Sequence, residues 1–269
     1  MPETYTAWHR KERGIWPAPL AIWPDLSISC LQDADANRLH YNGPMHIPDG
    51  FIDVQTSAVF AGLAAAGVAT ALKGARTQLD EKTAPLAGLT AVFIFAVQML
   101  NFPVVAGTSG HLLGGALAAV LVGPWAATLA LTVVLLMQGF LFADGGLTAI
   151  GLNVFNMGVL GVWAGYGIFL LLRKLLPKTK SSISLAAALG GLLSVPAAAV
   201  GFTIQYAMGA TATFSTTAVL SAMVGTHVLI GIGEALITGL TVSAVLASRS
   251  DLVYGWKNNV QKLEIRNAD

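Results

Sequence analysis

Three histidines adjoin or interrupt long apolar stretches of this sequence, where an imidazole could bind a transition metal. His46 precedes the first apolar stretch, His111 ends the polar segment NFPVVAGTSGH, and His227 lies within the last stretch. Imidazole donors with few carboxylates favour Ni, Cu, Zn or Co over Mg or Ca. Each histidine taken alone could instead form a helix–helix hydrogen bond, so their positions relative to one another decide between the two interpretations.

Seven apolar segments must position these histidines. They run over residues 51–73, 84–101, 108–122, 124–143, 146–173, 182–208 and 218–247. The chain of 269 residues is 55% hydrophobic and 11% charged, whereas an average soluble domain is about 25% charged. Since a membrane-spanning helix needs about 20 residues, the sequence predicts an all-α, polytopic membrane helical bundle with about seven transmembrane segments. The third segment is short and rich in glycine, and we expect it to be tilted or half-buried.

Composition and missing motifs exclude several classes of function. A net charge of +1 provides no basic field for nucleic acid, and the single cysteine, Cys30, forms neither a disulfide within the chain nor a CxxC site. The sequence contains no HExxH motif, no GxSxG nucleophile elbow and no Walker A phosphate loop. Any energy from ATP must therefore come from another chain.

Beyond residue 50, lysine and arginine occur only in alternate loops and in the tail, which predicts the orientation of the bundle. They follow the first, fifth and seventh segments, as Lys73, Arg76, Lys82, Arg173, Lys174, Lys178, Lys180, Arg249, Lys257, Lys262 and Arg266. The loops at 101–110, 143–146 and 209–217 contain neither residue type. By the positive-inside rule the basic loops are cytoplasmic. Seven spans then place Met45 outside and the C-terminus inside, in a multi-pass protein of the cell (inner) membrane.

With this orientation, the polar residues of the apolar segments fall mainly on the outer side. The three histidines share that side with Asp144, Asn153 and Asn156, which lie near the start of the fifth segment. An ionisable group inside a membrane is a functional-site hypothesis by default. Asn153 and Asn156 could instead join helices, and Glu234 could pair with a neighbour. Separate packing roles do not predict that all three histidines gather on one side.

Four stretches of the sequence resemble one known family. The stretches are MHIPDGF, NFPVVAGTSGHLLGGALAAVLVGPWAA, FADGGLTAIGLNVFNMG and HVLIGIGEALIT. They look like the CbiM/NikM family, the substrate-capture membrane components of energy-coupling-factor ABC transporters for cobalt and nickel, over nearly all of 45–247. The resemblance implies uptake of Co²⁺ or Ni²⁺ as the transported ligand, with cobalt slightly favoured for cobalamin biosynthesis, and no cofactor or enzymatic activity. It also implies an ATPase subunit, a transmembrane coupling subunit and a small companion membrane protein as partners.

The resemblance further implies a set of metal ligands. In the family a Met–His pair is the mature N-terminus and plugs into the bundle, and the matching residues here are Met45 and His46. The amine of residue one, with the amide and imidazole of residue two, forms fused five- and six-membered chelate rings. His111 matches the fourth nitrogen donor, which completes the tetragonal geometry associated with Ni(II) or Cu(II). His227 matches a histidine near the site.

Other polar residues receive supporting roles from the same resemblance. The residues expected to shape the loops over the site, without binding metal, are Asp49, Asn101, Ser109 and Asp144. Glu234 could help the bundle contact its coupling partner.

The residues before Met45 depart from the family pattern, because a nitrogen in a peptide bond cannot act as a free amine. Prolines and an aspartate interrupt WPAPLAIWPDLSISC, which disfavours a signal peptide. Translation from Met45, cleavage of the extension, and a ligand set of histidines alone are the open accounts. We expect residues 1–44 to be a mis-called, cleaved or disordered extension, 45–250 a membrane metal-capture domain and 251–269 a cytoplasmic tail.

Two other classes of protein were weighed against metal uptake. An intramembrane metalloenzyme could use the same histidines if one coordination position stayed open to water, but no acid or base is adjacent to His111. A structural membrane protein would not gather its polar residues on one side. Nitrogen ligands suit both cobalt and nickel.

Overall fold

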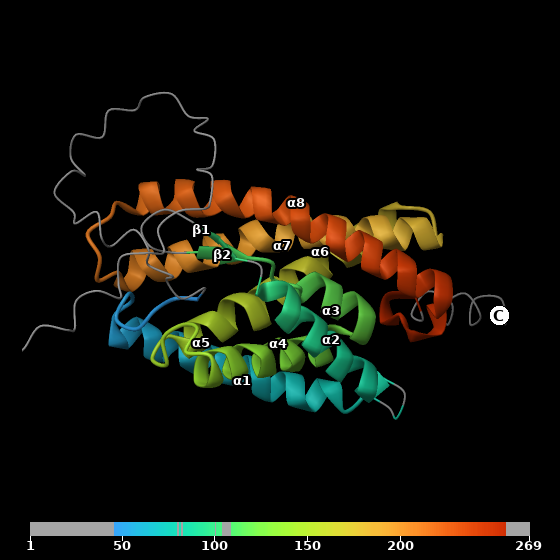
Figure 1. Ribbon diagram of the computed structural model, residues 1–269, viewed down its shortest axis with the longest axis horizontal. Helices are drawn as coiled ribbons and strands as arrows, with labels where there is room; N and C mark the ends of the chain where they lie inside the picture. Colours follow the sequence, from blue (N-terminus) through green and yellow to red (C-terminus); the bar gives the residue numbers. More distant parts are fainter. Residues whose placement is uncertain (1–45, 80, 82, 100, 104–108, 257–269) are drawn as a thin grey trace, which may run out of the picture. The chain divides into compact units, whose positions relative to one another are not determined.

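Helices form nearly all of the computed structural model, which describes residues 46–79, 81, 83–99, 101–103 and 109–256 (Figure 1). Met45, residues 1–44 and residues 257–269 of the predicted tail lie outside the described residues. The elements in chain order are α1 (Val54–Ala75), α2 (Thr83–Gln98), β1 (Asn101–Pro103), β2 (Ser109–His111), α3 (Gly115–Val122), α4 (Pro124–Leu141), α5 (Ile150–Asn153), the π-helix η3 (Val154–Gly161), α6 (Val162–Leu175), α7 (Lys180–Gly209), α8 (Thr216–Ser248) and the 3₁₀ turn η4 (Ser250–Leu252).

The all-α membrane bundle predicted from hydropathy is confirmed. Within the described residues, five helices are long and apolar enough to cross a membrane, namely α1, α4, the continuous helix of α5, η3 and α6, α7, and α8. The apolar helix α2 is shorter, with 16 residues. The number of spans and the orientation of the termini stay predictions.

The third predicted segment differs from the expectation of a tilted or half-buried helix. Its first part is strand β2, which pairs antiparallel with β1 so that Asn101 faces His111. Only Gly115–Val122 is helical, and all eight of these residues are buried. Helix α3 contacts α2, α4, α6, α7 and α8, so other helices separate it from the surroundings. A short helix built of small and apolar residues suits that central position.

Side-chain caps fix where several helices begin. Asp53 accepts a hydrogen bond from the Thr56 backbone N–H (2.7 Å) at the start of α1, and Ser215 accepts one from Ala218 (3.2 Å) at the start of α8. Both caps satisfy a backbone donor that the first helical turn leaves unpaired. They therefore set the length of the loops at one end of the bundle, next to residues 46–52.

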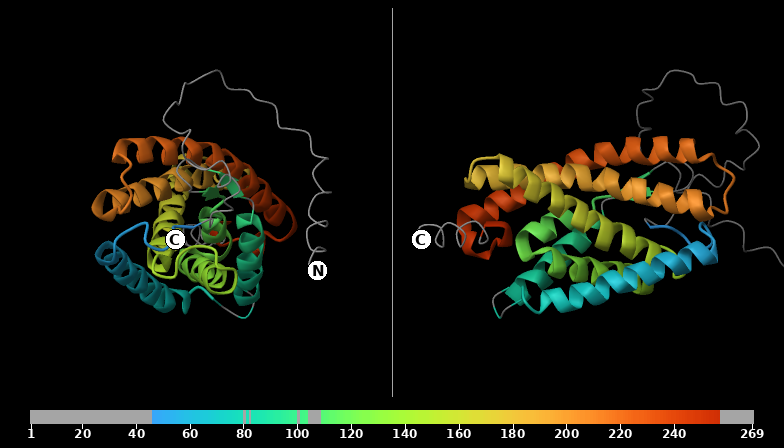
Figure 2. Two further views of the ribbon diagram at one scale, coloured as in Figure 1. Left: turned by 60° about the vertical axis from the view of Figure 1, so that its left-hand side comes forward. Right: turned by 180° about the vertical axis from the view of Figure 1, so that it is seen from behind.

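The outward surface of the helices is apolar. Large hydrophobic side chains remain exposed along α1, α2 and α8, among them Val54 (81% exposed), Leu89 (67%) and Leu229 (68%). A surface this apolar needs lipid around it, while the helices satisfy their own backbone groups. The chain is therefore a multi-pass membrane protein, in which α7 and α8 pack along each other (Figure 2).

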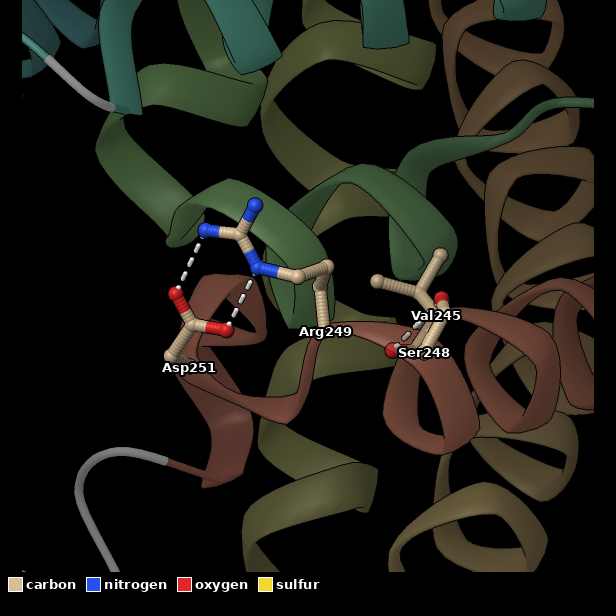
Figure 3. Close-up of polar contacts among 4 residues, drawn as sticks. All are labelled: Val245, Ser248, Arg249 and Asp251. Atoms are coloured by element: carbon tan, nitrogen blue, oxygen red, sulfur yellow. Dashed lines mark hydrogen bonds and ion pairs between the residues drawn. The ribbon is translucent and has the colours of Figure 1, made fainter.

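The basic loops predicted to be cytoplasmic meet at one end of the bundle. Gln78, after α1, donates from Nε2 to the Tyr254 hydroxyl (3.1 Å), and Arg173, near the end of α6, donates to the Gly255 carbonyl (3.0 Å). At the same end, exposed Arg249 makes two hydrogen bonds to Asp251 where α8 stops (Figure 3). Residues 46–52 precede α1, so the 22-residue helix separates them from this basic end.

Candidate metal site

The three histidines line one cavity beneath residues 46–48. Its volume is about 70 Å³, enough for a few water-sized groups. The residues that line it are His46, Ile47, Pro48, His111, Leu113, Asn153, Asn156, Met157, Ala198, Ala199, Phe202, Met223 and His227. The structure therefore brings together side chains that lie up to 181 positions apart in the sequence (46 to 227).

His46 and His111 are in direct contact. Their ring centroids are 4.7 Å apart, with the rings inclined by 63°. Both residues are buried, and Nδ1 of His46 lies 3.3 Å from Oδ2 of Asp144. Nε2 of His46 has no hydrogen-bond partner within the part of the chain that the structure describes. Two imidazoles at this separation could both reach one metal ion.

The tautomer of His111 leaves one ring nitrogen available as a donor. Its Nδ1 lies 2.9 Å from the carbonyl oxygen of Leu112, and because a carbonyl only accepts, Nδ1 carries the hydrogen. Burial, followed by the neighbouring imidazole of His46, lowers the pKa of His111 to about 3, so the ring is neutral at pH 7. His111 lies outside the helices that could span a membrane. A carbonyl on one ring nitrogen is the usual way to orient a metal-binding histidine.

His227 has the same tautomer as His111. Its Nδ1 donates to the Met223 carbonyl (2.7 Å) one turn earlier in α8, which leaves Nε2 with a lone pair. Since His111 and His227 both line the cavity, the imidazole of His227 reaches from helix α8 the same space that His111 reaches from strand β2. His227 is therefore placed to act on a bound ion either directly or through a water molecule.

The backbone after His46 is held by the start of the fifth segment. Ile47 N–H donates to Oδ1 of Asn153 (3.2 Å), and Gly146 N–H donates to the Ile47 carbonyl (2.9 Å). Gly145 has φ +99°, and a Cβ there would lie 2.7 Å from Cβ of His46. Glycine is thus needed both for the backbone conformation and for the close approach. These contacts fix the direction in which His46 enters the cavity.

Asp49 joins two loops without facing the cavity. Oδ1 of Asp49 accepts hydrogen bonds from the Thr148 hydroxyl (2.6 Å) and the Thr148 backbone N–H (2.7 Å). These bonds stabilise the charged carboxylate and lower the pKa of Asp49. Its expected role in shaping the loops over the site stays a prediction.

Two buried amides join η3 to α7. Nδ2 of Asn156 donates to Oε1 of Gln205 (2.8 Å), and Nε2 of Gln205 donates back to Oδ1 of Asn156 (3.0 Å). For Asn156 the helix-joining interpretation therefore describes the contact. Sequence reasoning missed Gln205, although a glutamine inside a long apolar segment is itself a signal of a buried polar contact.

Glu234 is buried and hydrogen-bonded within the chain. Only 2% of the residue is exposed. Its two carboxylate oxygens accept the backbone N–H groups of Leu113 (3.0 Å) and Gly114 (2.7 Å). A carboxylate enclosed in this way does not itself contact another chain, so any help that Glu234 gives the bundle in contacting its coupling partner stays a prediction.

The remaining predicted residues are placed less completely. Asn101 faces His111 across the β1–β2 pairing and Ser109 faces Pro103, so both belong to the hairpin that carries His111. Met45 lies outside the described residues. Among those that are described, no three His, Cys, Asp or Glu side chains are grouped closely enough to hold a metal ion. A site built on His46 and His111 therefore needs other kinds of donor.

Comparison with known proteins identifies a family for most of the described chain. Residues 46–252 match the family described as the cobalt uptake substrate-specific transmembrane region, CbiM. The chain belongs to this family. The match begins at His46 and includes every described residue of the cavity.

Relatives of this CbiM-family chain carry names related to metal transport. It is 33% identical over 216 residues to the cobalt transport protein CbiM of Sorangium cellulosum, covering 78% of this chain and 94% of that one. It is 37% identical over 209 residues to a provisionally named fused nickel transport protein NikMN of Archaeoglobus fulgidus, covering 78% and 68%. The crystal structure of a truncated transition metal transporter superposes with a TM-score of 0.71 at 34% identity, covering 76% of this chain and 99% of that one.

Proposed function

We propose that this chain captures Co²⁺ or Ni²⁺ from outside the cell in the cavity between His46, His111 and His227. The contact between the His46 and His111 rings, at 4.7 Å, is the observation that carries the proposal. Nitrogen donors in an enclosed cavity suit either cation. Cobalt is slightly favoured, for cobalamin biosynthesis, because the matching family is described by cobalt uptake.

The proposed ligands are the amine of Met45, the amide nitrogen and Nδ1 of His46, and Nε2 of His111. A six-membered chelate ring from the His46 amide must close through Nδ1. Oδ2 of Asp144 lies 3.3 Å from Nδ1 of His46. Asp144 would orient the His46 ring in this way until a cation replaces the carboxylate as the partner of Nδ1. His111 is supported as the fourth donor because Leu112 occupies its Nδ1 and leaves Nε2 for the metal.

This ligand set places the working N-terminus at Met45. An amine has a lone pair for the metal, whereas a peptide nitrogen that carries an upstream chain cannot supply the terminal donor. The backbone contacts of Ile47 to Asn153 and Gly146 support the plug because they hold the next residue inside the bundle. Release of the cation requires these donors to separate or to gain protons.

The chain is proposed to act as the substrate-binding component of an energy-coupling-factor ABC transporter. An ATPase subunit, a transmembrane coupling subunit and a small companion membrane protein would be its partners. The sequence contains no Walker A motif, so any energy from ATP must come from another chain.

The experiment compares two histidine variants of the protein purified from membranes in detergent. Ni²⁺ and Co²⁺ affinities are measured by titration calorimetry. His111→Ala removes a direct donor and should weaken binding by more than roughly 100-fold, whereas His227→Ala should cost roughly the 10–100-fold typical of outer-sphere partners. Thermal unfolding without metal checks that both variants fold.

Two results contradict the proposal. One is a wild-type protein that binds Ni²⁺ and Co²⁺ no more tightly than Mg²⁺, which prefers oxygen donors. The other is a folded His111→Ala variant with unchanged affinity. An equal loss in both variants would instead add His227 to the direct ligands.

A further inference from the structure

Glu234 makes its two hydrogen bonds to the segment that directly follows a proposed metal ligand. Its oxygens lie 3.0 Å from the Leu113 nitrogen and 2.7 Å from the Gly114 nitrogen, two and three residues after His111. The two partners are 121 and 120 positions away in the sequence. Helix α8 is thereby bonded to the corner between β2 and α3.

This corner has no cap of its own. Gly114 precedes α3 with φ +75° and provides no side-chain cap. The N–H groups of Leu113 and Gly114 therefore need an acceptor from elsewhere in the molecule, and Glu234 supplies it. A carboxylate satisfies such donors and interacts favourably with the positive end of a helix. Among the described residues, no Lys or Arg forms an ion pair with Glu234. The Glu234 carboxylate therefore acts as the acceptor for the backbone N–H groups that precede α3.

Neighbouring residues make the contact specific. Gly191 of α7 lies beside the Glu234 side chain, where an added Cβ would come within 3.1 Å of Cγ. On the other side of the corner, Nε2 of Gln98 donates to the Leu113 carbonyl (2.8 Å). Leu113 is thus held through both its N–H and its C=O. Leu112, the residue between it and His111, supplies the carbonyl that orients the imidazole.

We propose that Glu234 is a positioning residue that fixes His111 to α8, so that the fourth nitrogen of the metal site moves with that helix. The inference rests on the proposed function. The backbone of Ile47, next to His46, is held instead by Asn153 and Gly146, and Gly145 lies close against His46. A displacement of α8 relative to these elements would separate His111 from His46 and release the cation.

The test compares Glu234→Gln with Thr238→Val. Both variants are made in the full protein and purified from membranes. Glutamine has one acceptor oxygen, and its NH₂ group would oppose the second backbone donor. Thr238 is equally buried, one turn further along α8, and the N–H groups of Leu113 and Gly114 donate to Glu234 and not to it, so its variant is the matched control. Ni²⁺ affinity is measured by calorimetry, and equatorial nitrogens are counted by electron paramagnetic resonance of the Cu²⁺-loaded protein.

Glu234→Gln should weaken Ni²⁺ binding by roughly 10–100-fold and reduce the equatorial nitrogen count by one, whereas Thr238→Val should change neither. A merely structural role would lower thermal stability without changing the nitrogen count. In the His111→Ala background, Glu234→Gln should cause no additional loss, because the two substitutions act on one donor.

The proposal is overturned if folded Glu234→Gln binds Ni²⁺ within twofold of wild type with the same nitrogen count, or if its effect persists without His111. Should Glu234→Gln fail to fold, Glu234→Asp decides by the same outcomes, since it keeps the carboxylate and shortens its reach by one methylene. Failure of the wild-type protein to bind either Ni²⁺ or Co²⁺ more tightly than Mg²⁺ would overturn the proposed function itself.

Discussion

At the scale of single residues, main-chain contacts fix the orientation of the side chains that are proposed to bind metal. The carbonyl oxygens of Leu112 and Met223 accept hydrogen bonds from Nδ1 of His111 and His227, respectively. Each ring therefore keeps the lone pair of Nε2 for a metal ion. The amide of Asn153 holds Ile47, and the carboxylate of Glu234 holds Leu113. Orientation thus comes from main-chain contacts, which fix a ring with little loss of freedom when metal binds.

Asn153→Ala should affect both stability and metal binding. The substitution leaves the buried Ile47 N–H without its acceptor, at a cost of about 1–3 kcal/mol, and loosens the backbone beside His46. We expect roughly 10–100-fold weaker Ni²⁺ binding, measured by calorimetry, with lower thermal stability. Asn153→Asp retains the acceptor oxygen and should bind as wild type or more tightly. An alanine variant with unchanged affinity would show that Asn153 does not position His46.

At the scale of elements, an irregular helix forms one wall of the cavity. Residues 154–161 adopt π-helical winding within the longer helix from Ile150 to Leu175, and such insertions are frequent at functional sites. Asn153, Asn156 and Met157 all line the cavity from this region. The wider turn lets one stretch of helix hold Ile47 through Asn153 and α7 through Asn156.

Hydropathy predicted most helices but not the hairpin that carries His111. The segments at 124–143, 182–208 and 218–247 correspond to α4, α7 and α8 within three residues at each end. Strands β1 and β2 join through backbone groups, and their polar, glycine-containing sequence has no apolar alternation to mark them. The histidines could be grouped from the sequence because they share one side of the predicted bundle. The hydrogen-bond partners of Glu234 could not be predicted, because they are backbone N–H groups, which carry no residue-specific signal.

The loops between helices give a direct test of orientation. Thr213→Cys lies in the α7–α8 loop near residues 50–53, and Lys178→Cys lies in the basic loop before α7; both positions are exposed. An impermeant thiol reagent should label Thr213→Cys in intact cells, and Lys178→Cys only after permeabilisation, because basic loops are retained in the cytoplasm. Cys30 is replaced by serine in both. The reverse pattern would place the cavity on the cytoplasmic side.

At the scale of the whole molecule, the cavity and the basic loops lie at different ends of the described bundle. Polar residues around His46 lie near the start of α1, and the basic loops lie beyond its far end. Exposed apolar side chains cover the helices between them. This division agrees with capture of a cation on one side of a membrane and contact with cytoplasmic partners on the other.

The account depends on a free amine at Met45, and blocking that amine tests it most directly. The Ni²⁺ affinity of a chain that begins at Met45 is compared with that of the same chain acetylated at its amine, so that length and sequence match. Acetylation should weaken binding by more than roughly 100-fold, beyond the 10–100-fold typical of outer-sphere changes, because it removes one of four nitrogen donors. The uncleaved chain of 269 residues should bind as weakly as the acetylated form. Equal affinity for the free and acetylated forms would contradict the account.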